Sequence, residues 1–157
     1  MLIKNNTQLK RVMQQAAKQA LSEVEEQIKI CIDNYVRQYY TEYTPHQYKR
    51  TYQFLRSITK TEVIIRGNTI SCDIHIDMNL NYSEPASEVI DIINQGYHGN
   101  KSIKGTPVWQ TAMDRVNSTN MFVNGFREAL IKQGYEYTGI YEEVEISYQG
   151  SKSLAFF

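Results

Sequence analysis

Residues 62–80 read EVIIRGNTISCDIHIDMNL, and this stretch predicts the sheet around which the fold is organised. In its part 69–80, apolar residues at even positions alternate with polar residues at odd positions. Such a period of two is typical of a strand with one buried face and one polar face. Gly67 and Asn68 separate this run from the apolar stretch 62–66 and can supply the positive φ of a two-residue turn. We therefore expect a β-hairpin at this place.

The polar face of the second strand carries Asp73, His75 and Asp77, residue types that bind metal ions. At a rise of ~3.3 Å per residue, the two aspartates lie about 13 Å apart, whereas metal–ligand distances are only ~2.0–2.6 Å. An ion could be shared by an adjacent pair at most, with further ligands from Glu62 or His98. We expect no metal site and interpret the row as a solvated or partner-facing surface. A metal-dependent hydrolase using this face is kept as an alternative.

A long amphipathic helix is predicted over residues 7–41, because apolar residues recur there every three or four positions. At ~1.5 Å per residue this helix is roughly 50 Å long, so part of it has room to project from a small domain or to meet another chain. Glu25 and Lys29 stand four residues apart on another face. The expected apolar stripe consists of Leu9, Val12, Ala16, Ala20, Val24, Ile28, Cys31, Tyr35 and Tyr39.

Three further helices are predicted from start signals and spacing. The first begins at Thr44-Pro45 and runs to Ile58. The second spans about 85–95 and is followed by a loop at 97–105. The third begins at Thr106-Pro107 and continues to Gly134, although the segment NSTN at 117–120 leaves a break open as an alternative. Its expected apolar positions are Trp109, Ala112, Val116, Val123, Phe126 and Leu130.

Residues 139–148 read as a last strand, and the apolar tail LAFF closes the chain, within residues 149–157. No repeat or linker is visible, so we expect one domain over residues 1–157. Its fold class is α+β, with the long N-terminal helix and a C-terminal helix packed on a small, mainly antiparallel sheet.

Composition narrows the classes of function. Lys and Arg number 17, as do Asp and Glu, so the net charge is zero. This argues against a protein that coats nucleic acid or an anionic membrane. Cys31 and Cys72 occupy apolar positions, which favours buried thiols over a disulfide and fits a reducing cytoplasm. Twelve tyrosines are present, six of them between Tyr35 and Tyr52, and tyrosine is favoured at protein interfaces.

Motifs of catalysis are not found in the sequence. It contains no G-x-S-x-G and no H-E-x-x-H, and GNKSIKG lacks the spacing of a phosphate-binding loop. We expect neither enzyme activity nor a cofactor. The basic side of the helix that begins at Thr44 leaves open a nucleic-acid-binding module. Its residues are Lys49, Arg50, Arg56 and Lys60.

The segment YTPHQYKRTYQFLRSI, residues 43–58, resembles the Y-x-P-x-x-Y-x-R-T-x-x-L-x-x-S-I segment of the tail-completion, or head–tail joining, family of long-tailed bacteriophages and prophages. INQGYHG at 93–99 corresponds to that family's glycine-centred loop motif, and PVWQTAM at 107–113 to the proline-led start of its C-terminal helix. By order of elements the resemblance covers residues 7–134. The chain departs from the family in having Tyr52 where Gly is common, and GYHG where an acidic-aromatic-Gly-Thr signature is usual.

The resemblance implies a structural virion protein, a subunit that forms a homo-oligomeric ring at the head–tail junction as a tail terminator or completion protein. Its implied partners are copies of itself and the connector, adaptor and tail tube proteins. DNA passes through the lumen without specific binding, and no membrane is involved. The implied location is the tail or neck of a virion assembled in the bacterial cytoplasm. Our candidate interface residues are Tyr39, Tyr40, Tyr43, Tyr97, His98, Lys101, Lys104, Phe156 and Phe157.

Overall fold

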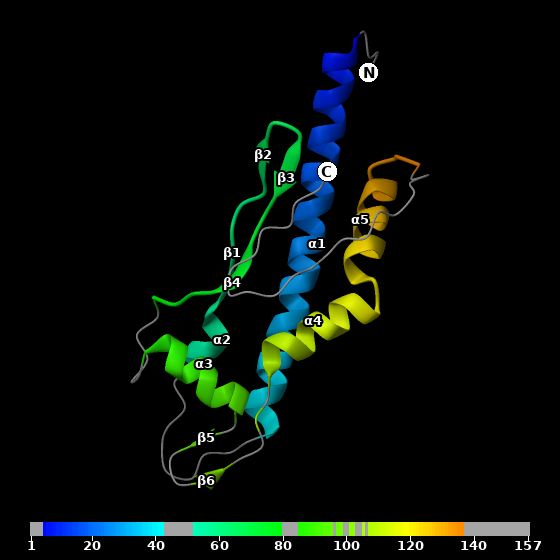
Figure 1. Cartoon of the computed structure of the whole chain (residues 1–157). Coiled ribbons are helices and arrows are strands. Elements are labelled where there is room, and N and C mark those ends of the chain that lie inside the picture. Colours follow the sequence, from blue (N-terminus) through cyan, green and yellow to red (C-terminus); the bar gives the residue numbers. More distant parts are fainter. Residues whose placement is uncertain are drawn as a thin grey trace. The chain divides into compact units, whose positions relative to one another are not determined.

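The computed structural model describes residues 5–42, 52–79, 85–95, 97–98, 101–102, 105 and 107–136. Its fold class is α+β, as predicted (Figure 1). The described helices are α1 (Asn6–Glu42), α2 (Gln53–Arg56), α3 (Ala86–Gln95), α4 (Val108–Ser118) and α5 (Met121–Lys132). The described strands are β1 (Ile58–Lys60), β2 (Ile64–Arg66), β3 (Thr69–Ser71), β4 (Ile74–Ile76), β5 (Tyr97–His98) and β6 (Lys101–Ser102). Over these ranges, no helix combines the length and apolar character needed to cross a membrane.

Contacts divide the chain into two compact units. Unit 1 consists of Met1–Ile28, Lys60–Ile74 and Asn120–Phe157, and unit 2 of Lys29–Thr59 and His75–Thr119. Helix α1 therefore contributes its N-terminal part to unit 1 and its C-terminal part to unit 2. The single domain predicted over the whole chain stays a prediction.

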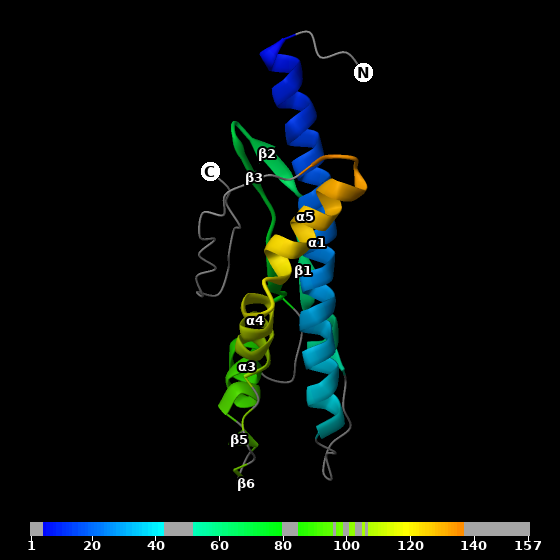
Figure 2. The same ribbon diagram turned by 90° about the vertical axis from the view of Figure 1, so that its right-hand side faces the viewer.

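The long helix is confirmed, since α1 begins and ends within one residue of the predicted range 7–41. Its buried face is broader than the predicted stripe. The expected member Leu9 is 42% exposed, whereas Leu21, Ile32 and Val36 are fully buried and were not predicted. In unit 1 this breadth has a physical reason, because α1 is contacted by both the β2–β3 hairpin and α5. Figures 1 and 2 show these two elements beside the N-terminal part of α1.

Helix α5 packs on α1 in the antiparallel direction through small residues. A Cβ atom added at Gly125 would lie 3.3 Å from Cγ2 of Val24 and 2.7 Å from Oε1 of Gln27. Further along α5, Lys132 pairs with Glu23 at 3.5 Å. The missing side chain at Gly125 thus allows the close approach of the two helices.

The hairpin forms where it was predicted, with Ile64 opposite Ser71 and Arg66 opposite Thr69. Gly67 has φ +63°, and a positive φ at the first of two turn residues is what a type II′ turn requires. The prediction of one strand over 69–80 was wrong, because this segment divides into β3 and β4.

The division arises because the segments between the paired strands differ in length by one residue. Residues 61–63 separate β1 from β2, whereas only Cys72 and Asp73 separate β3 from β4. The chain pairs β3 with β2 and β4 with β1. At the junction, Thr61 N–H donates to the Asp73 carbonyl and Asp73 N–H donates to Thr61 Oγ1, each at 2.9 Å. An extra residue on one strand interrupts a ladder in this way, and the buried alternation ends before Met78, which is 52% exposed.

In unit 2, the structure contradicts two predictions. Helix α2 ends at Arg56 because Ser57 N–H and Ser57 Oγ both donate to the carbonyl of Phe54, at 3.2 and 2.6 Å. The helix was predicted to reach Ile58, which instead begins β1, and its predicted start at Thr44 lies outside the described residues. The expected loop 97–105 contains a short antiparallel pair, β5–β6. By contrast, α3 matches the predicted helix 85–95.

The prediction of one helix that continues to Gly134 is wrong, and the alternative of a break is confirmed. Helix α4 ends at Ser118 and α5 begins at Met121, with Asn120 at φ 49° between them. This break shifts the buried positions by one residue. On α5 they are Phe122, Gly125 and Ala129, rather than the predicted Val123, Phe126 and Leu130.

Candidate functional site

Glu25 is an ionisable residue in the core of unit 1, with only 1% of its surface exposed. Its Oε2 atom lies 3.5 Å from Nζ of Lys60 on β1. The same ammonium group lies 2.8 Å from Oε2 of Glu26. The buried Cys72 side chain forms a hydrogen bond with the Glu25 carboxyl. We name these four residues the Glu25 cluster.

The environment of the cluster changes its acid–base properties. Burial raises the pKa of the Glu25 carboxyl above its ordinary value of 4.5, and the Lys60 ammonium opposes this change. A hydrogen bond to Glu26 is the main cause that raises the pKa of Lys60 above 10.5. Burial, and next the charge of Glu25, raises the pKa of Cys72 to about 12. At neutral pH the thiol is therefore protonated, and it donates its hydrogen bond rather than acting as a nucleophile.

One carboxylate oxygen of the cluster, Oε1 of Glu25, is buried and has no hydrogen-bond partner among the described residues. A buried polar atom without a partner costs roughly 1–3 kcal/mol. The cluster therefore holds a group whose charged form is poorly accommodated. Protonation of Glu25 removes the charge from the apolar core.

Sequence reasoning missed this arrangement. Glu25 was placed with Lys29 on a face of the helix other than the apolar one, and this is wrong for Glu25, which is buried. Lys29 binds Asp33 at 2.6 Å. A signal was present in the sequence, since Glu25 stands four residues after Leu21 and three before Ile28. A charged residue with two buried neighbours at helical spacing lies on the same face as they do.

The row that suggested a metal site is half-buried, with Asp73 just before β4, His75 within it and Asp77 just after it. His75 Nε2 is 3.0 Å from Thr59 Oγ1, and Asp77 Oδ1 accepts a hydrogen bond from Asn79 N–H at 2.9 Å. Oδ1 of Asp73 is buried without a hydrogen-bond partner in the part of the chain that is described. Within that part, no three His, Cys, Asp or Glu side chains could hold a metal ion together.

Two of the predicted interface residues, Tyr39 and Tyr40, belong to an aromatic cluster in unit 2. Their ring centroids are 5.4 Å apart, and the ring of Tyr40 lies 5.0 Å from that of Tyr52. Tyr39 also contacts Phe54 edge to face at 6.3 Å. Tyr52 is 47% exposed and has φ 57°, a conformation that costs most residues roughly 1–2 kcal/mol.

The other predicted residues divide into two groups. Tyr97 and His98 lie on β5, Lys101 lies on β6, and Arg56 is exposed at the end of α2. Lys60 is held by the two carboxylates described above. The remaining candidates lie outside the described residues, and they are Tyr43, Lys49, Arg50, Lys104, Phe156 and Phe157.

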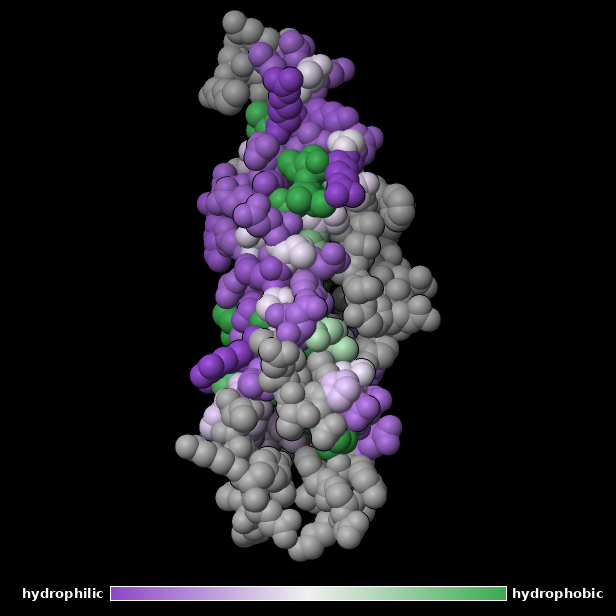
Figure 3. Space-filling model, turned by 90° about the vertical axis from the view of Figure 1, so that its left-hand side faces the viewer, coloured by the Kyte–Doolittle hydropathy of each residue, from purple (hydrophilic) through white to green (hydrophobic). Residues whose placement is uncertain are grey.

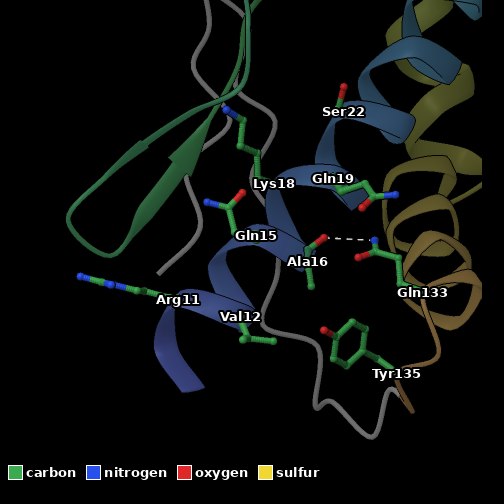
Figure 4. Close-up of a pocket in the computed structure, with 9 residues that line it drawn as sticks. All are labelled: Arg11, Val12, Gln15, Ala16, Lys18, Gln19, Ser22, Gln133 and Tyr135. Carbon is green, nitrogen blue, oxygen red and sulfur yellow. Dashed lines mark hydrogen bonds between the residues drawn. The ribbon is translucent and has the colours of Figure 1, made fainter. Parts of the chain in front are cut away.

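A hollow of about 620 Å³ opens on unit 1 at α1 and the end of α5 (Figure 4). Gln133 Nε2 donates to the carbonyl of Ala16 at 3.2 Å and so ties the end of α5 to α1. The described lining contains two cations and no carboxylate. It consists of Arg11, Val12, Gln15, Ala16, Lys18, Gln19, Ser22, Gln133 and Tyr135.

These observations define a small α+β protein with a buried carboxylate in its core and with aromatic, apolar and cationic groups at its surface. A model of the YomN family matches residues 5–132, from the residue before α1 to the last residue of α5. The match spans most of the chain, so the chain belongs to the YomN family. YomN is the name of a protein derived from Bacillus phages or prophages, which indicates a phage origin. No curated protein and no solved structure matches the chain.

Proposed function

We propose that the chain is a structural protein of a phage particle and acts by protein–protein contact rather than by catalysis. In this proposal it forms a homo-oligomeric ring at the head–tail junction, as a tail completion or terminator subunit. It is assembled in the bacterial cytoplasm and remains in the tail or neck of the virion. Membership of a phage-related family over residues 5–132 is the observation that carries this proposal.

Exposed apolar side chains on unit 1 support a role in contact. Leu9 and Met13 stand four residues apart on α1, so they share a face, and they are 42% and 59% exposed. Ile131 and Tyr135, at the end of α5, are 51% and 39% exposed. On the face drawn in Figure 3, apolar residues form small separate patches among hydrophilic ones. Methionine and tyrosine are enriched at protein interfaces, and a head-to-tail contact between copies closes a ring.

Substitution of Met13 tests whether this face of α1 forms the contact between copies of the chain. We expect Met13→Glu to weaken self-association at least about tenfold, because loss of an interface anchor costs more than about 1.4 kcal/mol. The matched control is Asn34→Glu, which adds the same charge at another exposed position of α1. Mass is measured by light scattering over a range of concentration, and melting confirms that both variants fold.

Two results would contradict this part of the proposal. One is a wild-type chain that stays monomeric at every concentration. The other is an equal loss of association in Met13→Glu and in Asn34→Glu, since a general effect of added charge would then explain it.

A further inference from the structure

Positive charge is concentrated at one place in a chain whose net charge is zero. Between Asn5 and Ser22 the chain carries Lys10, Arg11 and Lys18 and no acidic residue. The first acidic residue after this segment is Glu23, and its carboxylate binds Lys132. This part of α1 is therefore cationic without internal compensation.

The hairpin adds a fourth cation at the same place. Lys10 Nζ donates to Asn68 Oδ1 at 2.5 Å, and Gln14 Nε2 donates to the carbonyl of Gly67 at 2.7 Å. These bonds tie the turn of the hairpin to α1. They bring Arg66, the residue before the turn, next to the N-terminal part of the helix. We name Lys10, Arg11, Lys18 and Arg66 the cationic surface.

None of its side chains is neutralised by a carboxylate among the described residues, where the ion pairs involve other cations. Arg11 and Arg66 are exposed and Lys18 is half-buried. Figure 4 shows Arg11, Gln15 and Lys18 extending from the same side of α1. At ~1.5 Å per residue, the first and last of these three are about 10 Å apart along the helix.

The neutral groups around the cations are also hydrogen-bond donors. Gln15 and Gln19 offer amide N–H groups, and Ser22 offers a hydroxyl. Lysine, arginine, glutamine and serine are the side chains that contact phosphate and sugar in protein–DNA complexes. A row of cations and uncharged donors without a carboxylate fits a ligand that presents several anionic oxygens in a line.

We propose that the cationic surface binds the phosphate backbone of nucleic acid without reading base sequence. This inference rests on the proposed function for its setting, since it assigns this surface to the side of the subunit that faces DNA in the ring. Each phosphate contact adds about −0.9 to the slope of log K against log salt. A few contacts from a neutral protein give weak binding, which holds DNA in a lumen without preventing its movement.

Fluorescence anisotropy of the full chain with a labelled DNA duplex tests this inference. We expect the double variant Arg11→Gln, Lys18→Gln to bind at least about tenfold more weakly at low salt and to lower the salt slope by about 2. Glutamine is a good helix former, so the helix is preserved. The matched control Arg37→Gln, Arg115→Gln removes the same charge from exposed positions of unit 2 and is expected to bind like the wild type.

A second variant, Arg66→Gln, tests the cationic surface without changing α1. We expect it to lower the slope of log K against log salt by about 1. A wild-type chain that does not bind duplex at low salt would overturn the inference. An equal loss in the unit 2 control would overturn it too, because net charge alone would then explain binding. If poly-L-glutamate displaced the labelled duplex as effectively as unlabelled duplex does, the surface would be one that binds polyanions in general, and this would reject its assignment to phosphate.

The two proposals fail separately in these measurements. A chain that self-associates in light scattering but does not bind DNA contradicts only the cationic surface. A chain that binds DNA through Arg11 and Lys18 but remains monomeric contradicts only the ring.

Discussion

Glu25 shows how one residue can link the stability of unit 1 to pH. Because burial raises its pKa in the folded chain above 4.5, the folded state binds more protons than the unfolded state between these two values. The free energy of unfolding therefore falls as the pH rises from about 4.5 through the raised pKa of Glu25. Lys60 acts in a separate window, since its raised pKa gives a contribution that is present below 10.5 and lost at higher pH.

Replacing Glu25 tests this linkage. We expect Glu25→Gln to raise the free energy of unfolding at pH 7 and to remove the fall with pH, because the amide keeps the shape of the carboxyl without its charge. Lys60→Met is expected to act in the opposite direction and to cost about 3 kcal/mol at pH 7, since it leaves a buried carboxylate without its cation. Urea denaturation at a series of pH values measures both.

A double variant supplies the control for this pair. If the loss in Lys60→Met comes from the uncompensated carboxylate, the same substitution in the Glu25→Gln background costs much less. Equal losses in both backgrounds, or a Glu25→Gln variant that is less stable than the wild type at pH 7, would contradict the account of the cluster.

Among the elements, those with a long and regular period could be predicted from the sequence. The helix over 7–41 could be predicted from its apolar spacing alone, and the hairpin turn could be predicted from Gly67 between two apolar runs. The division of the second strand could not be predicted, because it depends on how many residues the facing strands place opposite each other at Asp73. The burial of Glu25 has a signal in its spacing to Leu21 and Ile28, but its ion pair could not be predicted, because its partner Lys60 is distant in sequence.

The break between α4 and α5 depends on Asn120, which adopts φ 49° and ψ 36°. Asparagine tolerates this left-handed conformation better than most residues, and a β-branched residue does not. We expect Asn120→Val to lower the free energy of unfolding by about 1–2 kcal/mol and Asn120→Gly to change it little.

Asn117→Val is the matched control, since Asn117 is exposed in the last turn of α4. We expect it to cost less than about 0.5 kcal/mol. Urea denaturation compares the three variants. If Asn120→Val is as stable as the control, the left-handed residue does not define the break.

At the scale of the whole molecule, the two units have different surfaces. Unit 1 carries the cationic surface and the exposed Leu9, Met13 and Ile131, whereas unit 2 carries the aromatic cluster around Tyr40 and Tyr52 and the exposed Ile30 and Met78. The sequence drew attention to the tyrosines because their number is high. It did not reveal the cationic surface, because the total charge is zero and Arg66 approaches α1 only through the fold. The candidate interface at Tyr39 and Tyr40 stays a prediction.

The proposed function is tested most directly by the composition of the phage particle. We would purify tailed particles from the phage or prophage that encodes the chain and measure its copy number by quantitative mass spectrometry. The account predicts that the chain is present in every preparation, at a small and constant number of copies per particle, as a single ring requires. Complete, tailed particles that lack the chain would contradict it.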